Sequence, residues 1–481
     1  MHAVGIRFTS RWFMAALVVV MSNHASGAAV FDIDRNLCSH AEIHAAIDSC
    51  TRLINDTNET DEVHETALRN RGSLFQSQGD FDLAIADYTA ALKLSPGGSS
   101  LNAETHAKTY ANRGLAYASK GDESSALADY DRAVMLDPAL SSAYLNRAAL
   151  YMKRDDNERA IADLDQVVQL DPKDATSYIN RGVAYIHRGD PDHAIADFST
   201  AIDLNPLDAT AWRSRSFAYR VKGNEVRATA DAKQAIRLDP KMAAAHKDLA
   251  LVLQAHGDIK GARVEFDKAI QLDPGDAKAM VARGDGYLAH RDREQAISDY
   301  SAAIAIDAKL VSAYINRGVA YLGKTDWDRA IADFTAAIGL GSAQQVAAYL
   351  NRGQALQAKG DREAALADFE QVIRLKPDAI EALRHRAFLR QAKGDFSGAA
   401  ADYGQVIALA PKDAEARRGR GYAELSQHDY GTAISDLSEA ITLNPKDALA
   451  YRFRGLAYAE THDLERAASD EKVSSGLDPK R

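Results

Sequence analysis

Four residues near the N-terminus have the side chains most often used for metal or redox chemistry. They are Cys38, His40, His44 and Cys50, in the spacing C-x-H-x3-H-x5-C. Two thiolates and two imidazoles could hold a tetrahedral zinc ion. The same two cysteines, the only ones in the chain, could instead be oxidised to a disulfide. The spacing matches no established zinc pattern, so we predict a Cys38–Cys50 disulfide and keep zinc binding as the alternative.

Three other short motifs lack a component that their chemistry needs. His64-Glu65 has no second histidine at the spacing of a zinc-protease helix. Gly284-Asp285-Gly286 lies inside a predicted helix with no strand before it, so it is not a dinucleotide-binding turn. The segment Pro96-Gly97-Gly98-Ser99 has no Gly-Lys-Ser/Thr and is interpreted as a flexible insertion. We therefore predict that the protein is not an enzyme and binds no cofactor.

The first 28 residues have the three-part pattern of a secretory signal peptide. Arg7 and Arg11 precede an apolar run over residues 12–21, and small residues up to Ala28 follow it. Ten apolar residues are too few to cross a bilayer, which needs about twenty. We predict cleavage near residue 28, a periplasmic or secreted protein without stable membrane insertion, and oxidation of the cysteine pair in that compartment.

The charge of the chain argues against binding to nucleic acid. The formal net charge is −10, and removal of residues 1–28 takes away two arginines and no acid. The mature chain then has 56 basic and 68 acidic side chains. Such an excess of negative charge is unfavourable for general contact with phosphate backbones.

A 34-residue repeat runs from residue 65 to the C-terminus. The tripeptide that begins at Asn70 recurs, in intact or degraded form, at residues 112, 146, 180, 214, 248, 282, 316, 351, 385, 419 and 453. Eight extra residues separate the first two repeats, and one extra residue lies near Gly339-Leu340-Gly341. Twelve tandem units of this length are typical of a solenoid.

Each repeat has the features of a helical hairpin. We count positions so that Asn146 is position 6 of its repeat. Position 8 is always Gly, Ala or Ser and position 20 is always Ala, so two antiparallel helices can approach closely. Position 16 is Asp in eleven repeats and Asn224 in the other, as expected for an N-cap of the second helix. Position 32 is Pro in ten repeats, where it ends the second helix.

This pattern resembles the tetratricopeptide repeat. In the third repeat, the family's signature positions hold Tyr144, Ala148, Tyr151, Ala160, Leu164 and Pro172. The resemblance implies an all-α fold, a right-handed superhelical solenoid of antiparallel helical hairpins. The predicted organisation is a signal peptide over residues 1–28, a capping segment over 29–64 and twelve repeats over 65–481. Within the capping segment, residues 41–55 resemble an isolated second helix that covers the first hairpin.

Two charged positions depart from the family pattern. Position 7 is Arg in eleven repeats, and position 23 is Asp in the same eleven. The sixth repeat has Leu249 and Glu265 instead. Positions 7 and 23 lie level on the two antiparallel helices, so we predict a ladder of ion pairs such as Arg147–Asp163. A charged binding stripe is the alternative. Repeats five and six are the least regular, which fits either a bend or sequence drift.

The family resemblance implies that positions 2, 5, 6 and 9 of the first helices line the inner groove. Position 6 is Asn in six repeats, and an amide can both donate to and accept from an extended backbone. Position 5 is apolar in repeats two to four and basic in repeats ten to twelve. The candidate peptide-binding residues are Asn70, Asn112, Asn146, Asn180, Asn316, Asn351, Arg384, Arg418 and Arg452.

Two functions follow from these features. The first is a non-enzymatic scaffold of the cell envelope that binds a protein or peptide in the groove, with an acidic partner favoured at the C-terminal half. The alternative is a structural or assembly component of envelope polysaccharide export. Ordered aromatic platforms or basic tracks for sugars would favour the alternative, and of the features above only the set Arg384, Arg418 and Arg452 points to it.

Overall fold

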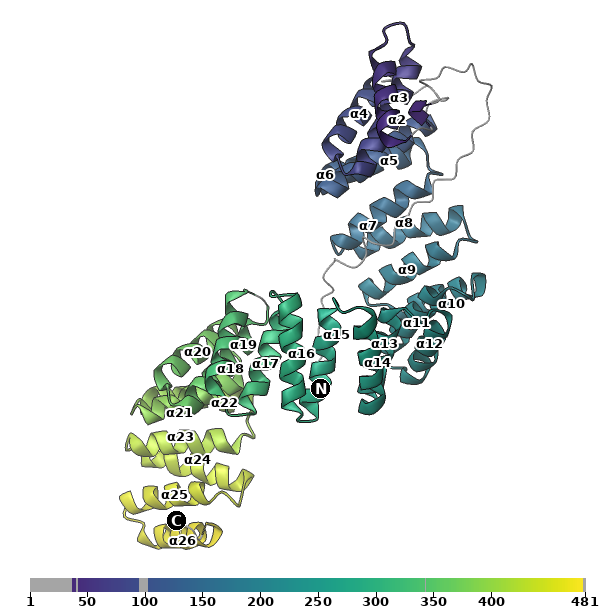
Figure 1. Ribbon diagram of the computed structural model, residues 1–481. Coiled ribbons are helices and arrows are strands. Elements are labelled where there is room, and N and C mark those ends of the chain that lie inside the picture. The colour runs from purple at the N-terminus through teal and green to yellow at the C-terminus, as the bar shows by residue number, and fades with distance from the viewer. Residues whose placement is uncertain (1–36, 40–41, 95–102, 342, 479–481) are drawn as a thin grey trace. The chain divides into compact units, whose positions relative to one another are not determined.

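The computed structural model describes residues 37–39, 42–94, 103–341 and 343–478, and the secondary-structure elements within these residues are all helices. The predicted signal peptide, His40 and the Pro96–Ser99 insertion lie outside these residues. The chain divides into an N-terminal unit up to Val252 and a C-terminal unit from Leu253. The division falls inside repeat six, the repeat that lacks the Arg–Asp pair. Figure 1 shows both units as stacks of helices.

The N-terminal unit begins with one single helix, which five hairpins follow. The single helix is α2 (Ile43–Asn55). The hairpins are α3 (Asp61–Gln78) with α4 (Phe81–Leu94), α5 (Ala103–Lys120) with α6 (Glu123–Leu136), α7 (Ser141–Lys153) with α8 (Asn157–Leu170), α9 (Ala175–Arg188) with α10 (Pro191–Leu204), and α11 (Ala209–Val221) with α12 (Glu225–Leu238). Helix α13 (Ala243–Ala255) spans the division between the units.

The C-terminal unit begins with α14 (Ile259–Leu272), which packs against the first of six hairpins. These are α15 (Ala277–Ala289) with α16 (Arg293–Ile306), α17 (Val311–Leu322) with α18 (Trp327–Gly339), α19 (Gln345–Lys359) with α20 (Arg362–Leu375), α21 (Ile380–Ala392) with α22 (Phe396–Leu409), α23 (Ala414–Ser426) with α24 (Tyr430–Leu443), and α25 (Ala448–Glu460) with α26 (Leu464–Leu477). The described residues therefore form an all-α solenoid.

The turn inside each hairpin has one fixed conformation. Position 15 has a positive φ in all twelve repeats, whether it is Gly, as at Gly189, or a residue with a side chain, as at Thr325. The Asp or Asn at position 16 then caps the second helix; Asp190, for example, accepts a hydrogen bond from the backbone N–H of His193. The same capping bond is present for every second helix from α6 to α26. The predicted N-cap role of position 16 is confirmed.

Close approach inside a hairpin explains the small residue at position 8. In repeat four, a Cβ added to Gly182 would lie 2.6 Å from Cε1 of Phe198, the buried residue at position 24. Where position 8 has a side chain, position 24 can be smaller, as in the pair Ala148 and Leu164. The side chains at positions 8 and 24 together fill a space of nearly constant size, so a larger one at either position requires a smaller one at the other. This is expected for a core packed as densely as a crystal.

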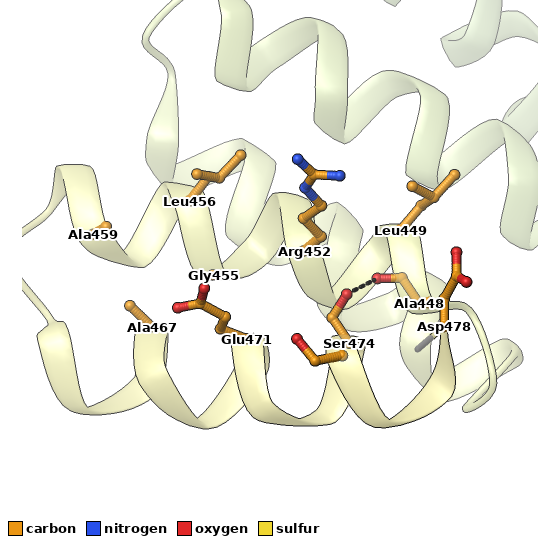
Figure 2. Close-up of a pocket in the computed structure, with 11 residues that line it drawn as sticks. Ala448, Leu449, Arg452, Gly455, Leu456, Ala459, Ala467, Glu471, Ser474 and Asp478 are labelled. Atoms are coloured by element: carbon orange, nitrogen blue, oxygen red, sulfur yellow. Dashed lines mark hydrogen bonds between the residues drawn. The ribbon is translucent and has the colours of Figure 1, made fainter. Parts of the chain in front are cut away.

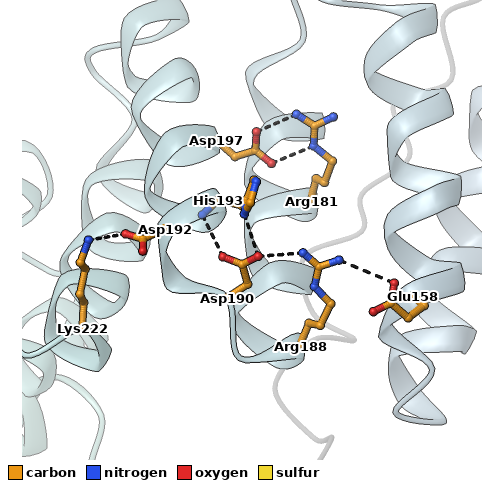
Figure 3. A network of polar contacts seen from close by, with 8 residues as sticks. All are labelled: Glu158, Arg181, Arg188, Asp190, Asp192, His193, Asp197 and Lys222. Carbon is orange, nitrogen blue, oxygen red and sulfur yellow. Dashed lines mark hydrogen bonds and ion pairs between the residues drawn. The ribbon is translucent and has the colours of Figure 1, made fainter.

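The Arg–Asp pairs form as predicted in all eleven repeats that carry them. In repeat four, Arg181 donates from Nε and Nη2 to the two carboxylate oxygens of Asp197, at 2.8 and 2.7 Å (Figure 3). The equivalent two-bond contact recurs in the other ten repeats. The Asp side chains are at most 9% exposed. The ladder is structural, so the charged binding stripe is not its role.

For nine of the eleven ladder arginines in the described residues, the third guanidinium nitrogen also bonds the preceding second helix. Nη1 of Arg181 donates to Asp165 of the preceding repeat, at 2.8 Å, and Nη1 of Arg215 donates to Ser199. In the first repeat, Nη1 of Arg71 donates to Thr51 of α2 at 2.9 Å. Helix α2 thus takes the place of a preceding second helix, as the capping interpretation predicted. The Cys38–Cys50 disulfide links α2 to the residues that precede it in the chain. Leu53 and Cys50 of α2 pack with Ala67 of α3.

A second series of ion pairs, which the sequence analysis missed, joins neighbouring repeats beside the hairpin turns, from position 13 or 14 of one repeat to position 17 or 18 of the repeat before it. Lys222 of repeat five binds Asp192 of repeat four, and Arg188 binds Glu158 of repeat three at 3.6 Å (Figure 3). Equivalent pairs are Lys120–Asp82, Lys153–Glu123, Lys324–Glu294, Lys359–Asp328 and Lys393–Glu363. Most of these side chains are well exposed, so each pair contributes at most about 1 kcal/mol.

The two kinds of ion pair predict different costs of mutation. Arg181→Met strands the buried Asp197 carboxylate and should lower the free energy of unfolding by about 3–5 kcal/mol. Arg181→Met combined with Asp197→Leu should cost less, because no charge is left without a partner. Hydrogen exchange of the α9 and α10 peptides measures the local change. Lys222→Met is the matched control and should cost less than about 1 kcal/mol; an equal loss in both single variants would contradict a buried structural ladder.

Candidate protein-binding face of the first helices

We call the side chains at positions 2, 5, 6 and 9 of the first helices the first-helix face. Within each unit, the first helices of several pairs of neighbouring repeats contact each other directly, as α5 and α7 do, and α15 and α17 do. The second helices show no comparable skipping contact in the described residues. The first helices are therefore the more closely spaced layer of each unit, as the family resemblance implied for the inner side.

In the N-terminal unit, this face carries three asparagines whose amides are not used by the fold. Asn112 and Asn180 are partly exposed, and Asn146 is 8% exposed. None of the three makes a hydrogen bond within the described residues. Asn70 differs, because its Nδ2 donates to Ser39 at 3.3 Å. The row is thus Asn112, Asn146 and Asn180, with Asn70 tied to the capping segment.

Apolar side chains surround this asparagine row. Ala111 is buried, and Leu145 and Ile179 at position 5 are partly buried. Position 9 adds further apolar side chains, Leu115, Val183 and Phe217. The face combines free amides, which can bond an extended backbone, with apolar surface that can bury side chains.

In the C-terminal unit, the two candidate asparagines have different surroundings. Nδ2 of Asn316 donates to Oδ1 of Asp285 at 2.7 Å, and the hydroxyl of Tyr300 donates to the same oxygen at 2.7 Å. Asn351 is partly exposed and makes no hydrogen bond within the described residues. In the next repeat position 6 is His385, whose ring bonds Gln357 at 2.9 Å and stacks on Phe369. Position 6 thus often bonds to the preceding repeat.

The three arginines predicted as a cationic track do not form one. Arg384 binds Asp413, and Arg418 binds Asp447 at 2.6 Å. Asp413 and Asp447 are also the N-caps of α23 and α25. These two arginines therefore join the end of one repeat to the start of the next, and their charges are neutralised. The sequence analysis missed this role because the partner is 29 residues away, in the following repeat.

Arg452 has no equivalent partner in the described residues. It is exposed and lines a depression between α25 and α26, together with Leu449, Leu456 and Glu471 (Figure 2). Position 24 is an aromatic or aliphatic residue in most repeats, but here it is the exposed Glu471. At its wall, the Ser474 hydroxyl donates to the backbone carbonyl of Ala448 at 2.9 Å.

Sequence comparison identifies the architecture. Models of the tetratricopeptide repeat match residues 66–97, 107–140, 148–219, 227–277, 281–348, 352–420 and 422–473. The chain belongs to the tetratricopeptide-repeat family. Repeat proteins of this kind generally bind other proteins and generally have no catalytic activity of their own.

Solved structures with a similar fold come from unrelated systems. The Cut9–Hcn1 hetero-tetramer of APC/C is 14% identical over 93% of both chains, with a TM-score of 0.40. A tetratricopeptide repeat protein from Parabacteroides merdae is 19% identical over 61% of this chain and 98% of its own, with a TM-score of 0.40. MamA protein is 27% identical over 37% of this chain and 93% of its own, with a TM-score of 0.33. No curated protein matches the sequence.

The described residues contain no group of histidines, cysteines and acids arranged to hold a metal ion. Gly284-Asp285-Gly286 lies within α15, as expected, so it does not form a nucleotide-binding turn. None of the described helices has both the length and the hydrophobicity that a membrane crossing requires.

One buried carboxyl on a first helix is not neutralised by the ladder. Glu424 occupies position 11, which is aromatic or leucine in most repeats, and it is 9% exposed. Its Oε2 has no hydrogen-bond partner, and Oε1 lies 3.5 Å from Nε of Arg420. Burial, with a smaller contribution from Asp436, raises the pKa of Glu424 to about 7.

This raised pKa predicts a pH-dependent stability. Between pH 4.5 and about 7, the folded chain holds a proton on Glu424 that the unfolded chain has released, so stability falls as the pH rises through this window. Glu424→Gln should therefore leave the melting temperature nearly unchanged at pH 5 and raise it at pH 8. Thermal unfolding at both pH values measures the difference. Glu439→Gln, at an exposed site in α24, is the control, and an equal gain at both pH values would rule out a titration of Glu424.

Proposed function

We propose that this protein is a non-enzymatic scaffold of the cell envelope that binds an extended segment of a partner protein on the first-helix face. The observation that carries the proposal is the row Asn112, Asn146 and Asn180, whose amides make no hydrogen bond within the described residues. The side chains of Asn112 and Asn180 are partly exposed, so a bound backbone can reach their amides. A bound backbone would supply both the donor and the acceptor that each amide needs.

The ladder of eleven Arg–Asp pairs supports a role in binding rather than in catalysis. The ladder arginines are bonded inside the hairpins, and Arg384 and Arg418 are bonded between repeats. In repeats two to four this leaves a face made mainly of amides and apolar side chains, which suits a segment of loosely specified sequence. Of the three arginines predicted to favour an acidic partner, only Arg452 is free for that role, so the proposal restricts an acidic contact to α25.

The same contacts weaken the polysaccharide alternative. A basic track for acidic sugars needs unpaired cations in successive repeats. Arg384 and Arg418 do not meet this condition. Tyr422 and Phe453 lie on the first-helix face, but they pack on each other with ring centroids 4.7 Å apart, so their faces are partly occupied. Protein binding is therefore the function that we propose.

A triple variant tests the proposed site. Asn112→Ala, Asn146→Ala and Asn180→Ala together remove three potential backbone contacts, each of which contributes about 0.5–1.5 kcal/mol. Binding to an array of random-sequence decapeptides should weaken at least about tenfold, and the melting temperature should change little. Gln166→Ala with Gln169→Ala, two exposed amides on α8, is the control. Unaltered binding in the triple variant would place the site elsewhere.

The location in the envelope is tested separately. The full chain, produced in a bacterium, should be recovered from the periplasm or the medium, with its N-terminus near residue 29 by mass spectrometry. Thiol titration of the unreduced, denatured protein should find no free cysteine, since Cys38 and Cys50 are the only two. Deletion of residues 12–21 should keep the chain in the cytoplasm. Recovery of uncleaved protein from the cytoplasm of the unaltered strain would contradict export.

A further inference from the structure

One carboxylate interrupts the first-helix face of the C-terminal unit. Asp285 occupies position 9 of repeat seven, where most repeats have an apolar residue, such as Val319 in the next repeat. Its Oδ1 accepts two hydrogen bonds from neutral donors, the Tyr300 hydroxyl and the Asn316 amide. No ion pair reaches Asp285 in the described residues, although the side chain is partly withdrawn from water.

The nearby ladder arginine does not neutralise this charge. Arg283, two residues before Asp285, donates Nε and Nη2 to Asp299 at 2.8 and 2.6 Å and Nη1 to Asp267. All three of its nitrogens are therefore committed to other carboxylates. Burial raises the pKa of Asp285 from its ordinary value, and the Tyr300 and Asn316 hydrogen bonds counteract only part of that shift.

The needs of the fold do not explain a carboxylate at this position. Two other repeats satisfy the buried tyrosine of position 24 with a neutral amide at position 12. The Tyr88 hydroxyl donates to Gln76 at 2.9 Å, and the Tyr403 hydroxyl donates to Gln391 at 3.3 Å. Repeat seven has Leu288 at position 12, and Asp285 takes over as acceptor. A neutral side chain would serve equally well, so the negative charge needs another explanation.

We propose that Asp285 binds the cationic side chain of a lysine or arginine in a protein segment that lies on the first-helix face of the C-terminal unit, an inference that rests on the function proposed above. Oδ2 takes no hydrogen bond within the described residues and is free to accept one from an ammonium or guanidinium. Tyr300 and Asn316 hold the carboxylate in a fixed orientation. Val319, which occupies position 9 of the next repeat on the same face, is partly buried, and an apolar side chain there can cover the aliphatic part of the cationic side chain. The net charge of −10 also favours the approach of a basic segment.

The test compares peptides that differ in one charge. Fluorescein-labelled decapeptides that bind in the array and contain one lysine are made again with norleucine or acetyl-lysine in its place. The unaltered protein should bind the lysine peptide about tenfold more tightly than either neutral peptide. Asp285→Asn keeps an acceptor for Tyr300 and Asn316 but removes the charge, so it should reduce this ratio to about one while its melting temperature stays within a few degrees.

Glu370→Gln, which removes an exposed carboxylate from the second helix α20, is the matched control and should keep the tenfold ratio. An unchanged ratio in Asp285→Asn would overturn the assignment of Asp285. An equal loss of affinity for all three peptides in that variant would also overturn it, because it would show a structural role alone. Failure of the unaltered protein to bind any array peptide would refute the proposed function itself, whereas binding without a lysine preference would refute only the role of Asp285.

Discussion

The interaction on which the structure depends is the two-bond contact between the Arg at position 7 and the Asp at position 23. A planar guanidinium fits a carboxylate in one orientation, so each pair fixes how the two helices of a hairpin face each other. For nine of the eleven arginines the third nitrogen also bonds the preceding second helix, as Arg181 does with Asp165. The same side chain therefore sets the geometry within one repeat and between neighbouring repeats. The desolvation of so many charges is tolerable only because each buried carboxylate has its partner.

This ladder also determines what the first-helix face can do. Each ladder arginine is bonded to its Asp, and in the described residues eight of the eleven also lie against an aromatic ring of their own helix, as Arg147 does at 5.6 Å from the Tyr144 ring centroid. Arg384 and Arg418 are occupied in a second way, by the N-cap aspartates of the following repeats. The groups left on the face are amides, apolar side chains and a few isolated charges such as Asp285 and Arg452. A face of this composition favours an extended polypeptide over a polyanion.

The hairpin turn keeps one backbone conformation although the residue at position 15 varies between repeats. Position 15 keeps a left-handed conformation even where it is Thr325 or His428, which costs about 1–2 kcal/mol relative to glycine. The capping aspartate and the ladder hold the turn in place from both sides. Repeat six keeps this turn, at Gly257, but it has Leu249 and Glu265 in place of the ladder pair. The chain divides into its two units within that repeat.

The sequence by itself determined the helical hairpins, their number and the eleven Arg–Asp pairs. These features are local or recur at one fixed spacing, so twelve copies reveal them, and the sequence also predicted the disulfide that joins Cys38 to Cys50. Only the tertiary structure decided which polar side chains are free. Asn316 and Asn112 occupy the same repeat position, yet of these two only Asn316 meets an acceptor. The reason is that position 9 of the preceding repeat is an aspartate, Asp285, only in repeat seven. Arg418 and Arg452 likewise occupy the same repeat position. Arg418 binds Asp447, which lies 29 residues further along the chain, whereas Arg452 has no equivalent partner within the described residues. Whether a polar side chain is free depends on single residues in a neighbouring repeat. A repeat pattern describes only what the repeats share, so it does not show these differences.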